Sequence, residues 1–257
     1  MVKATPEEPQ IPLPLFYKNP VALDAERHKE WGLKKNFGLG FAKDVNAVPL
    51  NMIEMPQAAH CYPIAFSSDS VATPVAILGL RDHENLCLTK SGEWEKGLYV
   101  PAYIRRYPFI FSEMQGSDQL TLCVDDVQIC VDHAMQEQSQ KFFDDQNAPT
   151  DLAKNALEFC KSYHAAAKQT QEFSKTMLDA GLLVTRQAEI NTPLGQKINF
   201  AGFQVIDEEK LSKISDKVFC EWRAKNYLPF IYAHLFSSAQ WQRLIGLLND
   251  RVKQNAA

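Results

Sequence analysis

The feature that most constrains this chain of 257 residues is a long amphipathic helix predicted in its middle. Pro149-Thr150-Asp151 supplies a helix start with an N-cap, and Gly181 is placed to end the helix in the left-handed conformation. Between them, mostly apolar residues recur at alternating steps of four and three: Leu152, Ala156, Phe159, Tyr163, Ala166, Thr170, Phe173 and Met177. Another side carries Lys154, Lys161, Lys168 and Lys175. One face of this helix must therefore pack against the rest of the protein while the lysines face water.

Short apolar runs separated by turn-forming residues fill the part of the chain from Val48 to about Val131. Runs of this length are typical of consecutive strands, here in a mostly antiparallel, curved sheet. They cover residues 62–66, 74–80, 85–88, 98–104, 109–111, 120–124 and 127–131. After the long helix, the pattern predicts two further strands at residues 183–190 and 198–206, and a buried one at 228–236.

Three shorter helices complete the predicted elements. One covers residues 24–35, with Asp24 as its N-cap, and a second begins at Asp207. Ser237 and Gln240 form a capping-box pair, which predicts the start of the last helix. Because no Gly/Ser-rich linker interrupts the chain, we predict an extended Pro-rich arm over residues 1–14 and a single α+β domain over 15–257. Its architecture is a curved, mostly antiparallel sheet packed with the long central helix and the C-terminal helix.

Charge and cysteine usage narrow the class of protein. The formal net charge is −4, whereas nucleic-acid binders that neutralise phosphates show a basic excess, so we expect no nucleic-acid partner. The six cysteines are scattered singly in apolar runs, as expected of buried free thiols in a reducing compartment. The sequence shows neither a signal-peptide pattern nor an apolar stretch of the roughly 18 residues that a membrane span needs. We expect a cytoplasmic protein with no membrane span.

Motifs of the common enzyme classes are incomplete. Gly38-Leu39-Gly40 begins a dinucleotide fingerprint, but Lys43 occupies the third glycine position. Phosphate-loop, nucleophile-elbow and zinc-protease motifs are absent from the sequence. His28-x-Glu30 has residue types that a non-haem iron site uses, with His133 as a third ligand, although a solvated helix face explains them better. We therefore predict no cofactor and leave open a metal-dependent, oxygenase-like enzyme. Its candidate ligands are His28, His60, His83, His133 and His234.

The segment from Trp94 to Phe111 has the most unusual composition in the chain. Arg105 and Arg106 are adjacent there and lie among tyrosines and prolines. Arginine grips carboxylate or phosphate groups through paired donors, and aromatic faces stack on planar groups, so this segment is a candidate site for a protein partner or a small anionic ligand. In the structural alternative, one arginine pairs with an internal carboxylate and the aromatics fill the core. In a strand the two arginines would point to opposite faces and differ in role. A nearby polar turn at residues 81–85 adds two further candidates. The candidate binding residues are Arg105, Arg106, Tyr103, Tyr107, Tyr99 and Trp94 of this segment, and Arg81 and Asn85 of the turn.

A set of short motifs extends from about Pro14 to Leu248. They are Pro14-Leu15-Phe16-Tyr17, Val48-Pro49-Leu50, Tyr62-Pro63-Ile64, Leu78-Gly79-Leu80, Glu84-Asn85-Leu86, Tyr99-Val100-Pro101, Ile104-Arg105-Arg106-Tyr107-Pro108-Phe109, Gly181-Leu182-Leu183 and Ile231-Tyr232-Ala233-His234-Leu235-Phe236-Ser237. Together they resemble the SapC family, whose name comes from a gene in a bacterial surface-layer locus. The arginine-rich motif is the most specific part of the resemblance.

The resemblance implies a bacterial source and no established catalytic activity, and it supplies no catalytic residues. The family name implies a link to surface-layer production. The genes that lie beside those of relatives imply instead a role in the uptake or modification of a compound. We therefore predict a non-catalytic accessory or binding protein.

Overall fold

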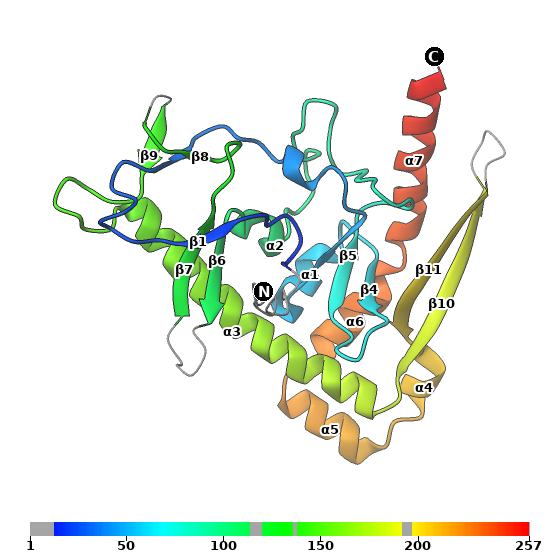
Figure 1. Ribbon diagram of the computed structural model, residues 1–257. Helices are drawn as coiled ribbons and strands as arrows, with labels where there is room; N and C mark the ends of the chain where they lie inside the picture. Colours follow the sequence, from blue (N-terminus) through cyan, green and yellow to red (C-terminus); the bar gives the residue numbers. More distant parts are fainter. Residues whose placement is uncertain (1–12, 114–119, 136–137, 192–196, 257) are drawn as a thin grey trace, which may run out of the picture. The chain divides into compact units, whose positions relative to one another are not determined.

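A computed structural model describes residues 13–113, 120–135, 138–191 and 197–256 (Figure 1). The chain divides into two compact units, each assembled from two separate stretches of sequence. The first unit lies within Met1–Asn36 and Tyr107–Ala156, and the second within Phe37–Arg106 and Leu157–Ala257. Antiparallel sheets and several helices make up the structure, so the predicted α+β class is confirmed.

The first unit contains two small antiparallel sheets. In one, the order is β1 (Pro20–Ala22), β7 (Leu120–Asp125) and β6 (Phe109–Glu113). In the other, it is β8 (Val131–Asp132), β2 (Gly32–Lys34) and β9 (Ser139–Lys141). The Phe109 and Phe142 rings meet edge to face in its core, with centroids 6.0 Å apart.

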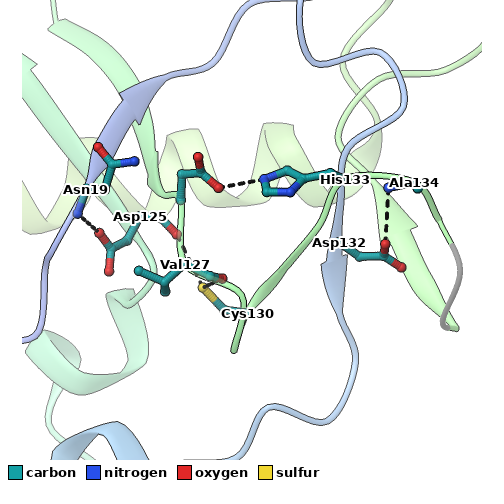
Figure 2. Close-up of polar contacts among 8 residues, drawn as sticks. Asn19, Asp125, Val127, Cys130, Asp132, His133 and Ala134 are labelled. Carbon is teal, nitrogen blue, oxygen red and sulfur yellow. Dashed lines mark hydrogen bonds and ion pairs between the residues drawn. The ribbon is translucent and has the colours of Figure 1, made fainter.

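A buried carboxylate fastens the segment before β1 to the first of these sheets. Asp125 has no exposed surface, and its Oδ1 accepts hydrogen bonds from the backbone N–H groups of Lys18 (2.8 Å) and Asn19 (2.6 Å; Figure 2). The Tyr107 hydroxyl donates to the other oxygen, Oδ2, at 2.9 Å. Three donors thus replace the water that this charge loses on burial.

The second unit is built on a five-stranded antiparallel sheet. Its order is β10 (Leu183–Asn191), β11 (Lys197–Ile206), β4 (Ile64–Ser67), β5 (Pro74–Ile77) and β3 (Ala47–Pro49). The short helical segments before the long helix are η1 (Gly40–Ala42), η2 (Met52–Glu54), α1 (Met55–Ala58) and α2 (Ala102–Arg106). The longer and later helices are α3 (Asp151–Asp179, in this unit from Leu157 on), α4 (Glu208–Ser212), α5 (Asp216–Ala224), α6 (Leu228–Ser237) and α7 (Gln240–Ala256).

The C-terminal helix α7 packs on this sheet through one apolar stripe. The cluster that it forms with the strands and their loops comprises Ala65, Ile77, Leu80, Leu86, Ile190, Phe203, Leu244, Leu248 and Val252. The pairing of β10 with β11 shifts register between Arg186 and Ala188, where β11 contains one residue more than β10 and forms a β-bulge. Gly202 lies in this bulge with a φ of +83°, a left-handed conformation that favours glycine. Gly79 is required by a close approach, because a Cβ there would lie 1.9 Å from the Glu84 carbonyl oxygen. Gly202 thus allows a left-handed backbone conformation, and Gly79 allows two backbone segments to approach closely.

The long helix and most strands lie where the sequence predicts them. The helix α3 runs from Asp151 to Asp179 with its four lysines exposed, and Thr170, Phe173 and Met177 are buried. The six cysteines are unpaired and four of them are buried, as predicted; Cys61 is half-buried and Cys220 exposed. In the described residues, no helix combines the length and the apolar character that crossing a membrane requires.

Five predicted elements are wrong. Residues 127–130 form a turn instead of a strand, and only Val131 of that predicted run belongs to a strand, β8. Residues 24–35 form turns and β2: the Asp24 side chain accepts the N–H groups of Glu26 and Arg27 as a helix cap does, but the chain then pairs through β2 with β8 and β9 instead of continuing as a helix. Residues 85–88 form a loop instead of a strand. Residues 98–101 form a loop that leads into α2, to which residues 102–104 belong. Residues 228–236 form α6 instead of a strand: an apolar run without alternation suits either structure, and Pro229 in its first turn favours a helix start.

Two of the later helices differ in part from prediction: one begins as predicted but is divided, and the other begins later. The helix expected at Asp207 is divided into α4 and α5, with Asp207 and Ser215 as their respective N-caps. Ser237 does not cap the last helix. Its hydroxyl is buried, donates to the His234 carbonyl oxygen (2.6 Å) and accepts the Ile64 N–H (2.9 Å), so α7 begins only at Gln240.

We predict that residues 15–257 unfold as one cooperative domain, because each compact unit needs residues from two distant stretches of the chain. The 1–14 arm lies almost wholly outside the described residues. Limited proteolysis with mass spectrometry tests the cooperativity. Cleavage within residues 135–150 that releases two stable, separately folded halves would contradict it.

Candidate functional site

The arginine pair lies on a short helix, not on the strand that its motif suggested. The backbone N–H groups of Ile104 and Arg105 both bond to the Pro101 carbonyl oxygen (3.0 and 3.1 Å), which opens α2. Successive residues of a helix point about 100° apart, so the two side chains still separate. Arg105 is exposed and Arg106 is half-buried.

The N-terminus of α2 is held by Glu54, a residue that the sequence analysis did not select. The residue is buried, with only 6% of its surface exposed. Oε1 accepts from the Tyr99 hydroxyl (2.7 Å) and the Ala102 N–H (2.6 Å), and Oε2 accepts from the Asn51 N–H (3.0 Å). The Asn51–Glu54 spacing is a capping box, the sequence signal that points to this residue. One carboxylate therefore joins η2, the Tyr99 loop and α2.

The guanidinium of Arg105 is fixed by its surroundings although it is exposed. Its Nη2 donates to the Tyr99 hydroxyl (3.0 Å) and its Nε to the Val100 carbonyl oxygen (3.0 Å). The guanidinium carbon lies 5.6 Å from the Tyr99 ring centroid and 5.3 Å from that of Phe159. Arg105 thus reaches the buried Glu54 through one tyrosine hydroxyl.

Burial and the hydrogen bond to Glu54 raise the pKa of Tyr99 to about 12, although the nearby Arg105 lowers it slightly. The phenol therefore remains protonated at neutral pH. It donates to the carboxylate and accepts from the guanidinium, so the three groups form a relay with a fixed direction.

Arg106 packs between two tyrosines. Its guanidinium carbon lies 5.0 Å from the ring centroid of Tyr103 and 4.3 Å from that of Tyr163, a residue of α3. The two tyrosine rings meet edge to face at 6.3 Å. Burial also raises the pKa of Tyr163, so this ring stays neutral beside the cation.

A pocket of about 240 Å³ opens between α2, η2 and α3. Its walls are mainly apolar and aromatic, and comprise Asn51, Ile53, Glu54, Gln57, Tyr99, Ala102, Arg105, Phe159, Ser162, Tyr163 and Ala166. Two arginines stack on the aromatic residues of these walls, against a single carboxylate that already accepts three hydrogen bonds. Such an arrangement favours an anion that carries a planar or apolar group.

The structure brings four of the predicted binding residues together here: Arg105, Arg106, Tyr103 and Tyr99. The others support loops. Trp94 donates to the Tyr62 hydroxyl (2.9 Å), and buried Asn85 bridges the Ala42 carbonyl oxygen and the Cys87 N–H (both 2.9 Å). Arg81 lies 3.7 Å from Glu84. Tyr107 belongs to the first unit, where it bonds to Asp125.

Two of the candidate metal ligands flank one tryptophan in the first unit. The rings of His28 and His133 lie 4.2 and 4.4 Å from that of Trp31. His28 is buried and its Nδ1 accepts the Asp24 N–H (2.9 Å), while His133 Nε2 bonds to an Asp126 carboxylate oxygen at 2.6 Å (Figure 2). Glu30 is exposed, 3.8 Å from Lys141. Across the described residues, no three His, Cys, Asp or Glu side chains gather as metal ligands would.

His234 is a buried structural histidine of α6. Its Nε2 accepts the Ile206 N–H (3.0 Å), and its ring lies 5.2 Å from that of Phe66. Burial lowers the pKa of His234 to about 4.

We expect Arg106→Ala to lower the free energy of unfolding by about 2 kcal/mol, because it removes a cation and an aliphatic stem packed between two rings. Arg105→Ala is expected to cost at most about 1 kcal/mol, because its side chain is exposed. Urea denaturation measures both values. Equal and small losses in the two variants would contradict this assignment of roles.

His234 is expected to make the protein less stable in mild acid. Its pKa rises from about 4 when folded to about 6.5 when unfolded, so as pH falls the unfolded state takes up the proton first. Between pH 7.5 and pH 5, this coupling lowers the free energy of unfolding by about 2 kcal/mol.

Urea denaturation at the two pH values tests this coupling. The drop should shrink in His234→Gln and persist in His60→Gln, a matched change at an exposed histidine. An undiminished drop in His234→Gln would refute the assignment.

Comparison with known proteins identifies the family. Neither a curated protein nor a solved structure matches the chain. The sequence model of one family, described as SapC, matches residues 23–244 of the 257. This range covers most of the chain and includes every residue of the Arg105 pocket, as the resemblance of the sequence motifs predicted. The chain therefore belongs to the SapC family.

Proposed function

We propose that this chain is a non-catalytic accessory or binding protein, and that the pocket beside Arg105 binds a small anionic ligand with a planar or apolar body. The observation that carries this proposal is the fixed guanidinium of Arg105 at an apolar, aromatic pocket. An arginine held by its neighbours loses little conformational entropy when a ligand arrives, so more of the interaction energy appears as affinity.

The free end of the guanidinium suits a carboxylate. Nε and one N–H of Nη2 are engaged by Val100 and Tyr99, and no described residue accepts a hydrogen bond from Nη1. Nη1 and the second N–H of Nη2 form the end-on fork that pairs with two carboxylate oxygens. The ring of Phe159 and the side chain of Ala166 then supply apolar contact for the rest of the ligand.

The chemistry of the polar groups supports binding over proton transfer. Glu54 has its oxygens occupied by three donors. Tyr99 has a pKa of about 12, too high for a general base at neutral pH. Both groups act as supports for Arg105 in this proposal.

The cellular part of the proposal follows the family. Membership in the SapC family supports a link to surface-layer production, or to the uptake or modification of a compound that the pocket would bind. A cytoplasmic location is also part of the proposal, and the six unpaired cysteines support it.

Isothermal titration calorimetry with benzoate and phenylacetate tests the ligand class. We expect both to bind, and the neutral methyl ester of benzoate to bind at least tenfold more weakly, because a charge-assisted hydrogen bond contributes about 1.5–3 kcal/mol. Arg105→Ala should weaken benzoate binding by a factor of ten or more. Lys168→Ala, which removes an exposed cation of α3 outside the pocket, should leave it unchanged.

Two outcomes would refute the proposal. One is equal affinity for benzoate and its ester, which would show that charge is not recognised. The other is an unchanged benzoate affinity in Arg105→Ala.

A further inference from the structure

A second, larger hollow adjoins the Arg105 pocket along α3. It has a volume of about 730 Å³, and its walls include Gln169, Glu172, Lys225 and Phe230. Ile53 belongs to the walls of both hollows. All of these residues lie in the second unit.

The exposure of Ile53 is unusual for its residue type. The side chain is 57% exposed on η2, between buried Met52 and buried Glu54. A large aliphatic side chain in water at the junction of two hollows is a candidate contact for an apolar group of a partner.

One line of residues on α3 connects the two hollows. Ser162 and Ala166 line the Arg105 pocket, and Gln169 and Thr176 line the second hollow. Their separations of four, three and seven residues place them along a single side of the helix. From Phe159 to Asp179, the first and last α3 residues of the two walls, a helix rises by roughly 30 Å.

We propose that the two hollows form one groove, the α3 groove, which binds an extended peptide segment of a partner protein. This inference rests on the proposed anion site and names its ligand class. A carboxylate of the peptide pairs with Arg105, and an apolar side chain of the peptide packs beside Ile53.

Length and charge favour a peptide. An extended chain rises about 3.3 Å per residue, so nine or so residues fill a groove of roughly 30 Å. The end of the groove farthest from Arg105 carries both signs of charge. Lys175 and Asp179 form an ion pair there at 2.8 Å, and Glu172 and Lys225 line the same hollow. Such a rim suits the alternating donors and acceptors of a peptide backbone and disfavours an acyl chain.

A phage-displayed library of random nine-residue peptides, selected on the full chain, supplies the probes. Fluorescence polarisation with the enriched synthetic peptides then measures affinity. We expect the enriched peptides to carry a carboxylate and an apolar residue at a constant spacing. Ile53→Asp should weaken their binding at least tenfold, and the milder Ile53→Ala at least threefold. The matched control Lys168→Ala should leave it unchanged.

Benzoate separates the two proposals. Gln169→Trp, a bulky change in the second hollow outside the Arg105 pocket, should weaken peptide binding at least tenfold and leave benzoate affinity within a factor of two, whereas Arg105→Ala should weaken both benzoate and peptide. The groove is refuted, and the anion site retained, in either of two cases. In one, benzoate binds through Arg105 but no peptide is enriched; in the other, Ile53→Asp leaves peptide affinity unchanged. If peptides bind in an Ile53-dependent way but benzoate does not bind, the small-ligand proposal falls instead.

Two other occupants would also overturn the groove proposal. If decanoate competes with benzoate, and if longer fatty acids bind more tightly than shorter ones, the ligand is an acyl chain. A dimer seen by light scattering that dissociates in Ile53→Asp would identify a second copy of this chain.

Discussion

A buried carboxylate has to be hydrogen-bonded, and in the second unit this requirement on Glu54 determines the geometry of the candidate site. Its three donors are the backbone N–H of Asn51, which is the N-cap of η2, the Tyr99 hydroxyl and the backbone N–H of Ala102, the first residue of α2. Removing any of them would leave part of a charge without compensation in a poorly solvated place. The position of Arg105 follows, since its guanidinium is bonded to the same tyrosine. The geometry of the proposed anion site thus follows indirectly from the hydrogen bonds that one buried acid requires.

The same physical rule operates in the first unit. Asp125, with no exposed surface, accepts two backbone N–H groups of the segment before β1 and the hydroxyl of Tyr107. Tyr99 and Tyr107 come from one arginine-rich stretch of sequence, yet each donates to a different buried carboxylate in a different unit. Their hydroxyls are structural donors, and burial raises the pKa of both phenols. Tyr99 also accepts a hydrogen bond from the exposed guanidinium of Arg105.

Sequence patterns located the elements whose periodicity is strong. The alternation of steps of three and four over residues 152–177 can only be a helix with one buried face, and α3 has that form. Residues 228–236 show why a uniform apolar run is ambiguous, because a helix and a strand both bury it and nothing local separates them. Asp24 has the bonds of a helix cap, but the pairing of β2 with β8 and β9 outweighed the helix that this cap predicted.

The sequence by itself determined the α+β class, the long helix with its lysine-bearing side, the unpaired cysteines and the unusual composition of the Arg105–Arg106 motif. These features depend on periodicity and composition, which act over a few neighbouring residues. Only the tertiary structure decided that Glu54 anchors the motif, that Phe159 and Tyr163 stack on its arginines, and that the motif itself is helical. Those contacts join residues about 50 positions apart, and their partners are chosen by packing and by the hydrogen-bonding demand of a buried charge, neither of which is written in local spacing.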